Sequence, residues 1–186
     1  ETESFAQYDL LVVPALYAAP EALLQKINDY VAAGGHLFTT FKTGFTDENL
    51  KVFHDSQPHI LDRCLGISYS HFTFPKQVKL SGETYHCEDN ELKNFMELVN
   101  PEGAQVLASY DHYNWKRYAA VTRNAYGKGT ATYLGCWTGD AMLREILTDV
   151  LKDAGLWGME QEVEFPVIMK DDVTKMKISK QDIAGK

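Results

Sequence analysis

A short apolar run that stops at a proline constrains the fold of this chain more than any other feature. Residues 10–13 read Leu-Leu-Val-Val and are followed by Pro14. A strand that is apolar on both sides, rather than alternating, is typical of the interior of a parallel sheet, where helices cover both faces. We therefore expect a central strand of an α/β domain here.

The residues that follow predict a crossover to a parallel neighbour. Pro20 suits the first helical position, and apolar residues then recur at helical spacing until Gly34-Gly35, which favours a left-handed stop. Residues 37–41 are strand-like and follow at once. Strand, helix and strand joined by such short connections predict a parallel arrangement.

Further along the chain, the patterns predict a hairpin and more helices. Residues 117–122 and 130–134 are β-rich and are joined by turn residues, which predicts an antiparallel hairpin with a longer loop. Asp140 is a good N-cap for a final helix that stops at Gly155. Two other helical patterns are expected, a short one from Pro58 to Gly66 and one through Leu92, Phe95, Met96 and Val99.

These elements predict one three-layer α/β domain with a mixed, mostly parallel sheet over residues 1–157. Residues 158–186 are rich in charge and poor in large apolar side chains, so they are expected to be a linker or the start of a C-terminal β domain. The polar residues 42–57 follow a predicted strand, at the end where α/β domains usually bind ligands.

Composition and charge argue against several classes of partner. The net charge is −8 and no stretch gathers Lys and Arg, so a nucleic acid is not expected. Apolar runs fall short of the roughly 20 residues that cross a membrane. The first residues lack the basic start and apolar run of a signal peptide, which suggests a cut from a longer chain and favours a cytoplasmic location.

The candidate catalytic motifs are incomplete. Residues 135–139 (GCWTG) follow a strand and precede a helix, as a nucleophile elbow does, but Trp137 stands in the nucleophile's place and Cys136 beside it. Residues 127–130 (GKGT) lack the spacing of a phosphate loop and predict a glycine-rich turn.

No His and Cys spacing matches a metal site, so neither metal nor cofactor is expected. We expect Cys64, Cys87 and Cys136 to be free, buried thiols, because three widely spaced cysteines form no disulfide framework.

Aromatic side chains gather between residues 110 and 137. Core packing and strand propensity explain most of such a concentration. Aromatic faces also stack on sugars or fill subunit interfaces, and the candidates for that role are Tyr113, Trp115 and Trp137.

Several segments, in the right order, resemble a known family. In the first half of the chain, these segments are residues 8–17 (YDLLVVPALY), 30–37 (YVAAGGHL), 40–44 (TFKTG) with 47–49 (DEN), and 61–67 (LDRCLGI). The second half adds residues 120–124 (AVTRN), 126–129 (YGKG) and 133–135 (YLG). Together they resemble the middle domain of family 42 β-galactosidases over roughly residues 8–156.

The resemblance implies a flavodoxin-like fold of the class I glutamine amidotransferase type that has lost its catalytic triad. It implies a role in holding subunits together as a homotrimer. The family's two catalytic glutamates belong to a preceding (β/α)₈ barrel that binds the β-galactoside, so no catalytic residue is expected in this chain. The family's domain normally opens with a further strand, helix and strand that this sequence lacks, which predicts an exposed sheet edge.

Three functions remain open on the sequence alone. The first is a non-catalytic assembly domain of a β-galactosidase that hydrolyses terminal β-D-galactosides. The second is a carbohydrate-binding module that uses Tyr113, Trp115 or Trp137 as stacking platforms. The third is a cysteine hydrolase of amidotransferase-like fold that uses Cys136.

Overall fold

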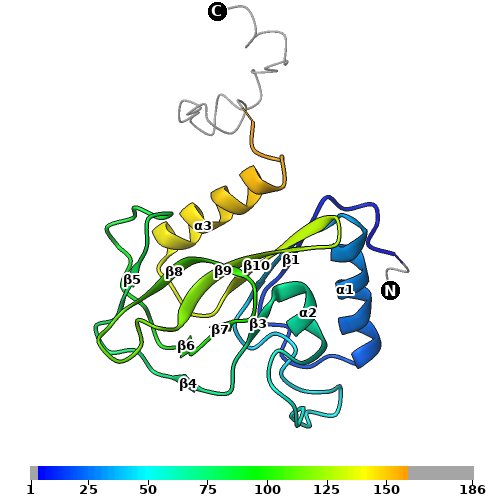
Figure 1. Ribbon diagram of the computed structural model, residues 1–186, viewed down its shortest axis with the longest axis horizontal. Helices are drawn as coiled ribbons and strands as arrows, with labels where there is room; N and C mark the ends of the chain where they lie inside the picture. Colours follow the sequence, from blue (N-terminus) through cyan, green and yellow to red (C-terminus); the bar gives the residue numbers. More distant parts are fainter. Residues whose placement is uncertain (1–3, 159–186) are drawn as a thin grey trace, which may run out of the picture. The chain divides into compact units, whose positions relative to one another are not determined.

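A six-stranded mixed sheet with helices on both faces organises the fold (Figure 1). The computed structural model describes residues 4–158, and the unit Glu1–Leu156 is described here by itself. The sheet order is β1-β2-β10-β9-β8-β5. Its strands are β1 (Leu10–Val13), β2 (His36–Thr40), β5 (Lys79–Ser81), β8 (Gln105–Asp111), β9 (Ala119–Tyr126) and β10 (Gly129–Leu134).

The other elements lie on the two faces and at one end of this sheet. The helices are α1 (Glu21–Ala33), the 3-10 turn η1 (His59–Leu61), α2 (Asp62–Leu65) and α3 (Asp140–Asp153). Two small antiparallel pairs complete the described fold, β3 (Ile67–Ser68) with β7 (Asn100–Pro101) and β4 (Phe72–Thr73) with β6 (Met96–Glu97). None of the described helices is long and apolar enough to cross a bilayer.

The predicted crossover is confirmed. Strands β1 and β2 are parallel, with Leu10 opposite His36, and α1 connects them. Helix α1 ends at Gly34, whose φ of 122° is readily adopted only by glycine. Pro20 lies one position earlier than expected, at the N-cap.

The prediction of a mostly parallel sheet is wrong, although the sheet is mixed. Only the pairings of β2 with β1 and with β10 are parallel, and the other three are antiparallel. The reason is connectivity: β8, β9 and β10 follow one another through loops too short for a crossover. The hairpin of β9 and β10 is confirmed, with a tight turn at Gly127-Lys128 in place of the longer loop.

Strand β1 is also not central, since it forms one edge of the described sheet. The Val12 side chain is 53% exposed as a result. The prediction of an exposed sheet edge therefore agrees with the structure.

The expected helix through Leu92, Phe95, Met96 and Val99 is absent, and the segment forms β6 and β7 instead. Its backbone bonds to the end of β10: the Trp137 amide donates to the Phe95 carbonyl and the Glu97 amide to the Gly135 carbonyl. These tertiary hydrogen bonds outweigh the helical spacing of apolar residues. Asp140 is the first residue of α3 rather than its N-cap, because Gly139 occupies that position.

Alternating residues along the central strands build a core on each face of the sheet. Leu37 packs in the core under α1 and α2, whereas the next residue, Phe38, packs in the core under α3. Tyr133 and Leu134 of β10 divide in the same way. Strands β2 and β10 are thus covered on both sides, as three layers require, whereas β1 is only partly covered.

One buried amide ties α1 to α2. The Asn28 side chain is 1% exposed, donates to the Ile60 carbonyl over 2.8 Å and accepts from the Cys64 amide over 3.1 Å. Removing it would leave both backbone groups without their partner in a dry environment.

We expect Asn28→Ala to lower the free energy of unfolding by about 1–3 kcal/mol, because two buried backbone groups lose their hydrogen bonds. Denaturant unfolding followed by circular dichroism measures this. Asp29→Ala on the exposed side of the same helix is the matched control and should change stability by less than about 0.5 kcal/mol. Equal effects of the two substitutions would show that the Asn28 bonds contribute nothing.

A second polar group is buried at the carboxyl end of β2 and β10. The Glu97 carboxylate accepts hydrogen bonds from the Lys42 amide over 2.9 Å and from the Tyr133 hydroxyl over 2.6 Å. The side chain is fully buried. Burial raises the pKa of Glu97 from 4.5 to about 7, and the two donors oppose that rise.

A raised carboxyl pKa makes stability fall as the pH rises, because the folded state holds its proton longer than the unfolded state. We expect wild type to lose roughly 3 kcal/mol relative to Glu97→Gln between about pH 5 and pH 8. Chemical unfolding of both proteins across this range measures the difference. Parallel stability curves would mean that Glu97 ionises in the folded state as it does in the unfolded chain.

Candidate functional site

The carboxyl ends of the three parallel strands meet at one edge of the sheet. The segments that leave β1, β2 and β10 there begin at Pro14, Phe41 and Gly135. The loop between β8 and β9 reaches the same edge, because β9 is antiparallel to β10 and Val121 lies opposite Leu134. This is the edge at which open α/β sheets bind ligands.

Six aromatic rings form a continuous row along this edge, which we call the aromatic row. Neighbouring ring centroids lie 5.1–6.3 Å apart, within the range of favourable aromatic contacts. In order, the rings belong to Tyr17, Phe45, Phe72, Phe95, Phe41 and Trp137. Tyr17, Phe72 and Trp137 are 43%, 46% and 48% exposed, so the row presents apolar surface to its surroundings.

The Lys42 ammonium lies over the middle of the row. Its Nζ is 3.8 Å from the ring centroid of Phe45, 3.4 Å from that of Phe72 and 5.3 Å from that of Phe95. Partial burial lowers the pKa of Lys42, and the nearby Glu97 charge counteracts the effect. None of the ion pairs among residues 4–158 involves Lys42.

The backbone under the row is held firmly. Lys42 has a φ of 62°, and its amide donates to the buried Glu97 carboxylate. Trp137 is bonded from both sides, since its amide donates to Phe95 and its carbonyl accepts from the Lys93 amide over 2.8 Å. The row is therefore preorganised, which lowers the entropic cost of binding a partner.

The three aromatic residues singled out in the sequence lie at this edge in two groups. Trp137 ends the aromatic row. Tyr113 and Trp115 lie in the β8–β9 loop, where each packs on His112, with centroid distances of 4.5 and 3.9 Å. Tyr113 is 81% exposed, whereas Trp115 packs against the core under α3. The ring contacts of the described residues do not join the two groups.

Sequence reasoning missed Lys42 and the other five rings of the row, which belong to Tyr17, Phe41, Phe45, Phe72 and Phe95. These residues are spread between positions 17 and 95, and no local spacing marks them as one group. Only the polar segment after the second strand pointed to this edge as a place for a ligand.

Cys136 lies inside the core under α3 and is fully buried. Burial raises the pKa of the Cys136 thiol well above its ordinary value. A buried thiol that resists ionisation is a poor nucleophile. Cys64 is equally buried, and its pKa is raised to about 12, whereas Cys87 is partly exposed. All three are free, as predicted.

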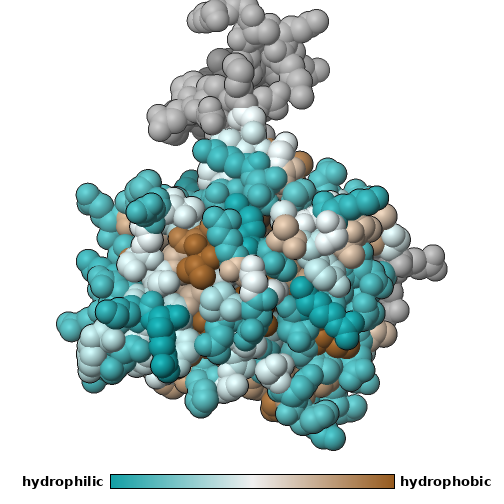
Figure 2. Space-filling model, viewed as in Figure 1, coloured by the Kyte–Doolittle hydropathy of each residue, from teal (hydrophilic) through white to brown (hydrophobic). Residues whose placement is uncertain are grey.

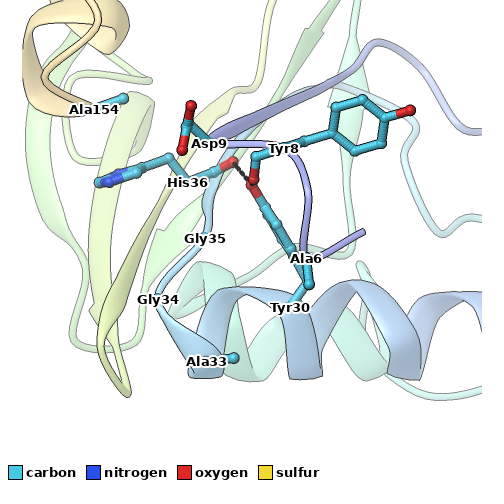
Figure 3. A pocket seen from close by; sticks show the side chains of 9 residues that line it. All are labelled: Ala6, Tyr8, Asp9, Tyr30, Ala33, Gly34, Gly35, His36 and Ala154. Atoms are coloured by element: carbon cyan, nitrogen blue, oxygen red, sulfur yellow. Dashed lines mark hydrogen bonds between the residues drawn. The ribbon is translucent and has the colours of Figure 1, made fainter. Parts of the chain in front are cut away.

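No cluster of His, Cys, Asp and Glu within residues 4–158 has a geometry suited to a metal ion. A hollow of about 320 Å³ lies at the opposite, amino end of β1 and β2 (Figure 3). The Tyr30 hydroxyl there donates to the carbonyls of Tyr8 and His36, so its hydrogen-bonding capacity is used within the fold (Figure 3).

Comparison with known proteins gives one consistent family. A family model described as "Beta-galactosidase trimerisation domain" matches residues 1–157. Among curated proteins, β-galactosidase LacA of Lactobacillus acidophilus is 33% identical over 159 residues, which cover 83% of this chain and 23% of that protein. β-Galactosidase bgaB of Geobacillus kaustophilus is 28% identical over 149 residues, covering 80% of this chain and 22% of that protein.

Solved structures agree in fold. The cold-adapted β-galactosidase from Rahnella sp. R3 has a TM-score of 0.73 and 27% identity, covering 81% of this chain and 23% of that one. Gan42B, a GH42 β-galactosidase from G. stearothermophilus studied as its E323A mutant, has a TM-score of 0.75 and 24% identity, covering 84% and 23%. The chain thus spans about a quarter of the length of these relatives, and, because the family model matches most of its residues, it belongs to the β-galactosidase trimerisation domain family.

Proposed function

We propose that this chain is the non-catalytic assembly domain of a larger β-galactosidase and holds its subunits together as a homotrimer. The aromatic row is the observation that carries the proposal: the edge where an α/β enzyme would place its catalytic groups presents exposed rings and a buried thiol instead. Exposed apolar surface of this kind marks interaction sites. The face of the molecule seen in Figure 2 is mainly hydrophilic, with a few separate apolar patches.

In the longer protein, this domain works beside others. The chain spans 23% of β-galactosidase LacA. As the family resemblance implies, the substrate, a terminal β-D-galactoside, is bound and hydrolysed by a barrel outside this chain. We propose that residues 158–186 are a linker or the start of a C-terminal β domain. Apart from Gly158, these residues lie outside the described part, so the boundary at 157 stays a prediction.

The fold is of the flavodoxin-like, class I glutamine amidotransferase type with its catalytic function lost. Three features support this: the β1-α1-β2 crossover, the parallel pairing of β10 with β2, and a strand-to-helix turn at residues 135–139. In that turn Trp137 is exposed and Cys136 faces the core, so the turn presents a ring where a nucleophile would be needed.

Light scattering behind size exclusion tests the assembly role. We expect the weight-average mass of the 186-residue chain to rise with concentration toward three times 21.0 kDa, because the exposed rings are buried on association. A strict monomer across the whole concentration range would contradict the proposal.

A carbohydrate-binding module is the second candidate, favoured by the exposure of Trp137 and Tyr113. If it is right, galactose or lactose should produce a saturable change in Trp fluorescence, and Trp137→Phe should remove most of it, since the indole would stack on the sugar. Glucose and buffer titrations are the controls. A linear response to every sugar would reject this function.

A further inference from the structure

The Lys42 cation lies at the centre of the aromatic row. The nearby Glu97 carboxyl group is buried and already accepts hydrogen bonds from the Lys42 amide and the Tyr133 hydroxyl. The Lys42 ammonium is partly withdrawn from water and lies over three rings, and none of the described ion pairs includes it. A cation held on aromatic faces still gains from a carboxylate that approaches from the open side.

We propose that the aromatic row is a subunit contact surface, and that a second copy of this chain covers it and places a carboxylate against Lys42. The inference rests on the proposed assembly function and specifies which surface performs it. The chain carries 26 acidic against 18 basic side chains, so another copy brings carboxylates in excess. Charge complementarity at an otherwise apolar contact fixes the register of the partner.

The composition of the row suits such a contact. It combines Trp, Tyr and Phe rings with one cation and includes no acidic side chain, which is the pattern of an interface centre. Its backbone is held by Glu97 and by the hydrogen bond from the Trp137 amide to the Phe95 carbonyl, so association does not have to order it. A closed trimer joins two different patches, and the carboxylate therefore comes from a part of the neighbour other than its own row.

Substitutions that remove one ring or the charge test this surface. We expect Trp137→Ala, Phe72→Ala and Lys42→Gln each to raise the dissociation constant of the assembly by roughly tenfold or more, as hot-spot residues do. Tyr8→Ala is the matched control, since Tyr8 is 48% exposed and lies before β1, at the other end of the strand. Sedimentation equilibrium measures the constants, and circular dichroism checks that each variant is folded.

Salt dependence tests the carboxylate separately. Wild-type association should weaken as the ionic strength rises, and Lys42→Gln should lose most of that dependence. If wild type associates but all three variants match Tyr8→Ala, the surface is wrong while the assembly function stands. If wild type remains a monomer at every concentration, both proposals fail.

Cross-linking the unmodified chain avoids variants altogether. A carbodiimide couples the Lys42 amine to an adjacent carboxylate as an amide, and mass spectrometry identifies the joined peptides. With a mixture of ¹⁴N- and ¹⁵N-labelled chains, we expect mixed-isotope products at Lys42. If the products at Lys42 join only peptides of the same label, the carboxylate beside Lys42 belongs to the same chain, and the proposal is overturned.

Discussion

The buried Glu97 carboxyl group connects the separate pieces of backbone on which the aromatic row is built. Its two oxygens bind the Lys42 amide and the Tyr133 hydroxyl, and its own amide donates to the Gly135 carbonyl. The Tyr110 hydroxyl donates to the Glu97 carbonyl over 2.7 Å. One residue thus joins the ends of β2 and β10 to β8, and hydrogen bonds offset part of the cost of burying its charge.

Those parts of the fold that depend on local chemistry could be predicted from the sequence. The crossover through α1 follows from helical spacing and from the glycine stop at Gly34, both of which act within a few residues. Gly66 likewise ends α2 in the left-handed conformation, with a φ of 61°. The hairpin of β9 and β10 follows from its turn residues.

The parts of the fold that depend on contacts between residues far apart in the sequence could not be predicted from it. Residues 92–99 have helical spacing, yet they exchange backbone hydrogen bonds with Gly135 and Trp137, which follow β10, and this pairing requires an extended backbone. Strand β1 is apolar on both sides, with Leu11 and Val13 packed against the core under α1 and Leu10 against the core under α3. That pattern does not distinguish an edge from a centre. Of the candidate site, Trp137 was found as part of an aromatic concentration, whereas Lys42 and Phe72 come together only in three dimensions.

The edge position of β1 has a consequence for how this domain can change in size. A sheet grows sideways, along its hydrogen bonds, and β1 is the outermost strand on its side of the described sheet. The aromatic row lies at the ends of the strands, at right angles to that direction of growth. Strands added beside β1 would therefore enlarge the domain while leaving the row, and whatever covers it, in place.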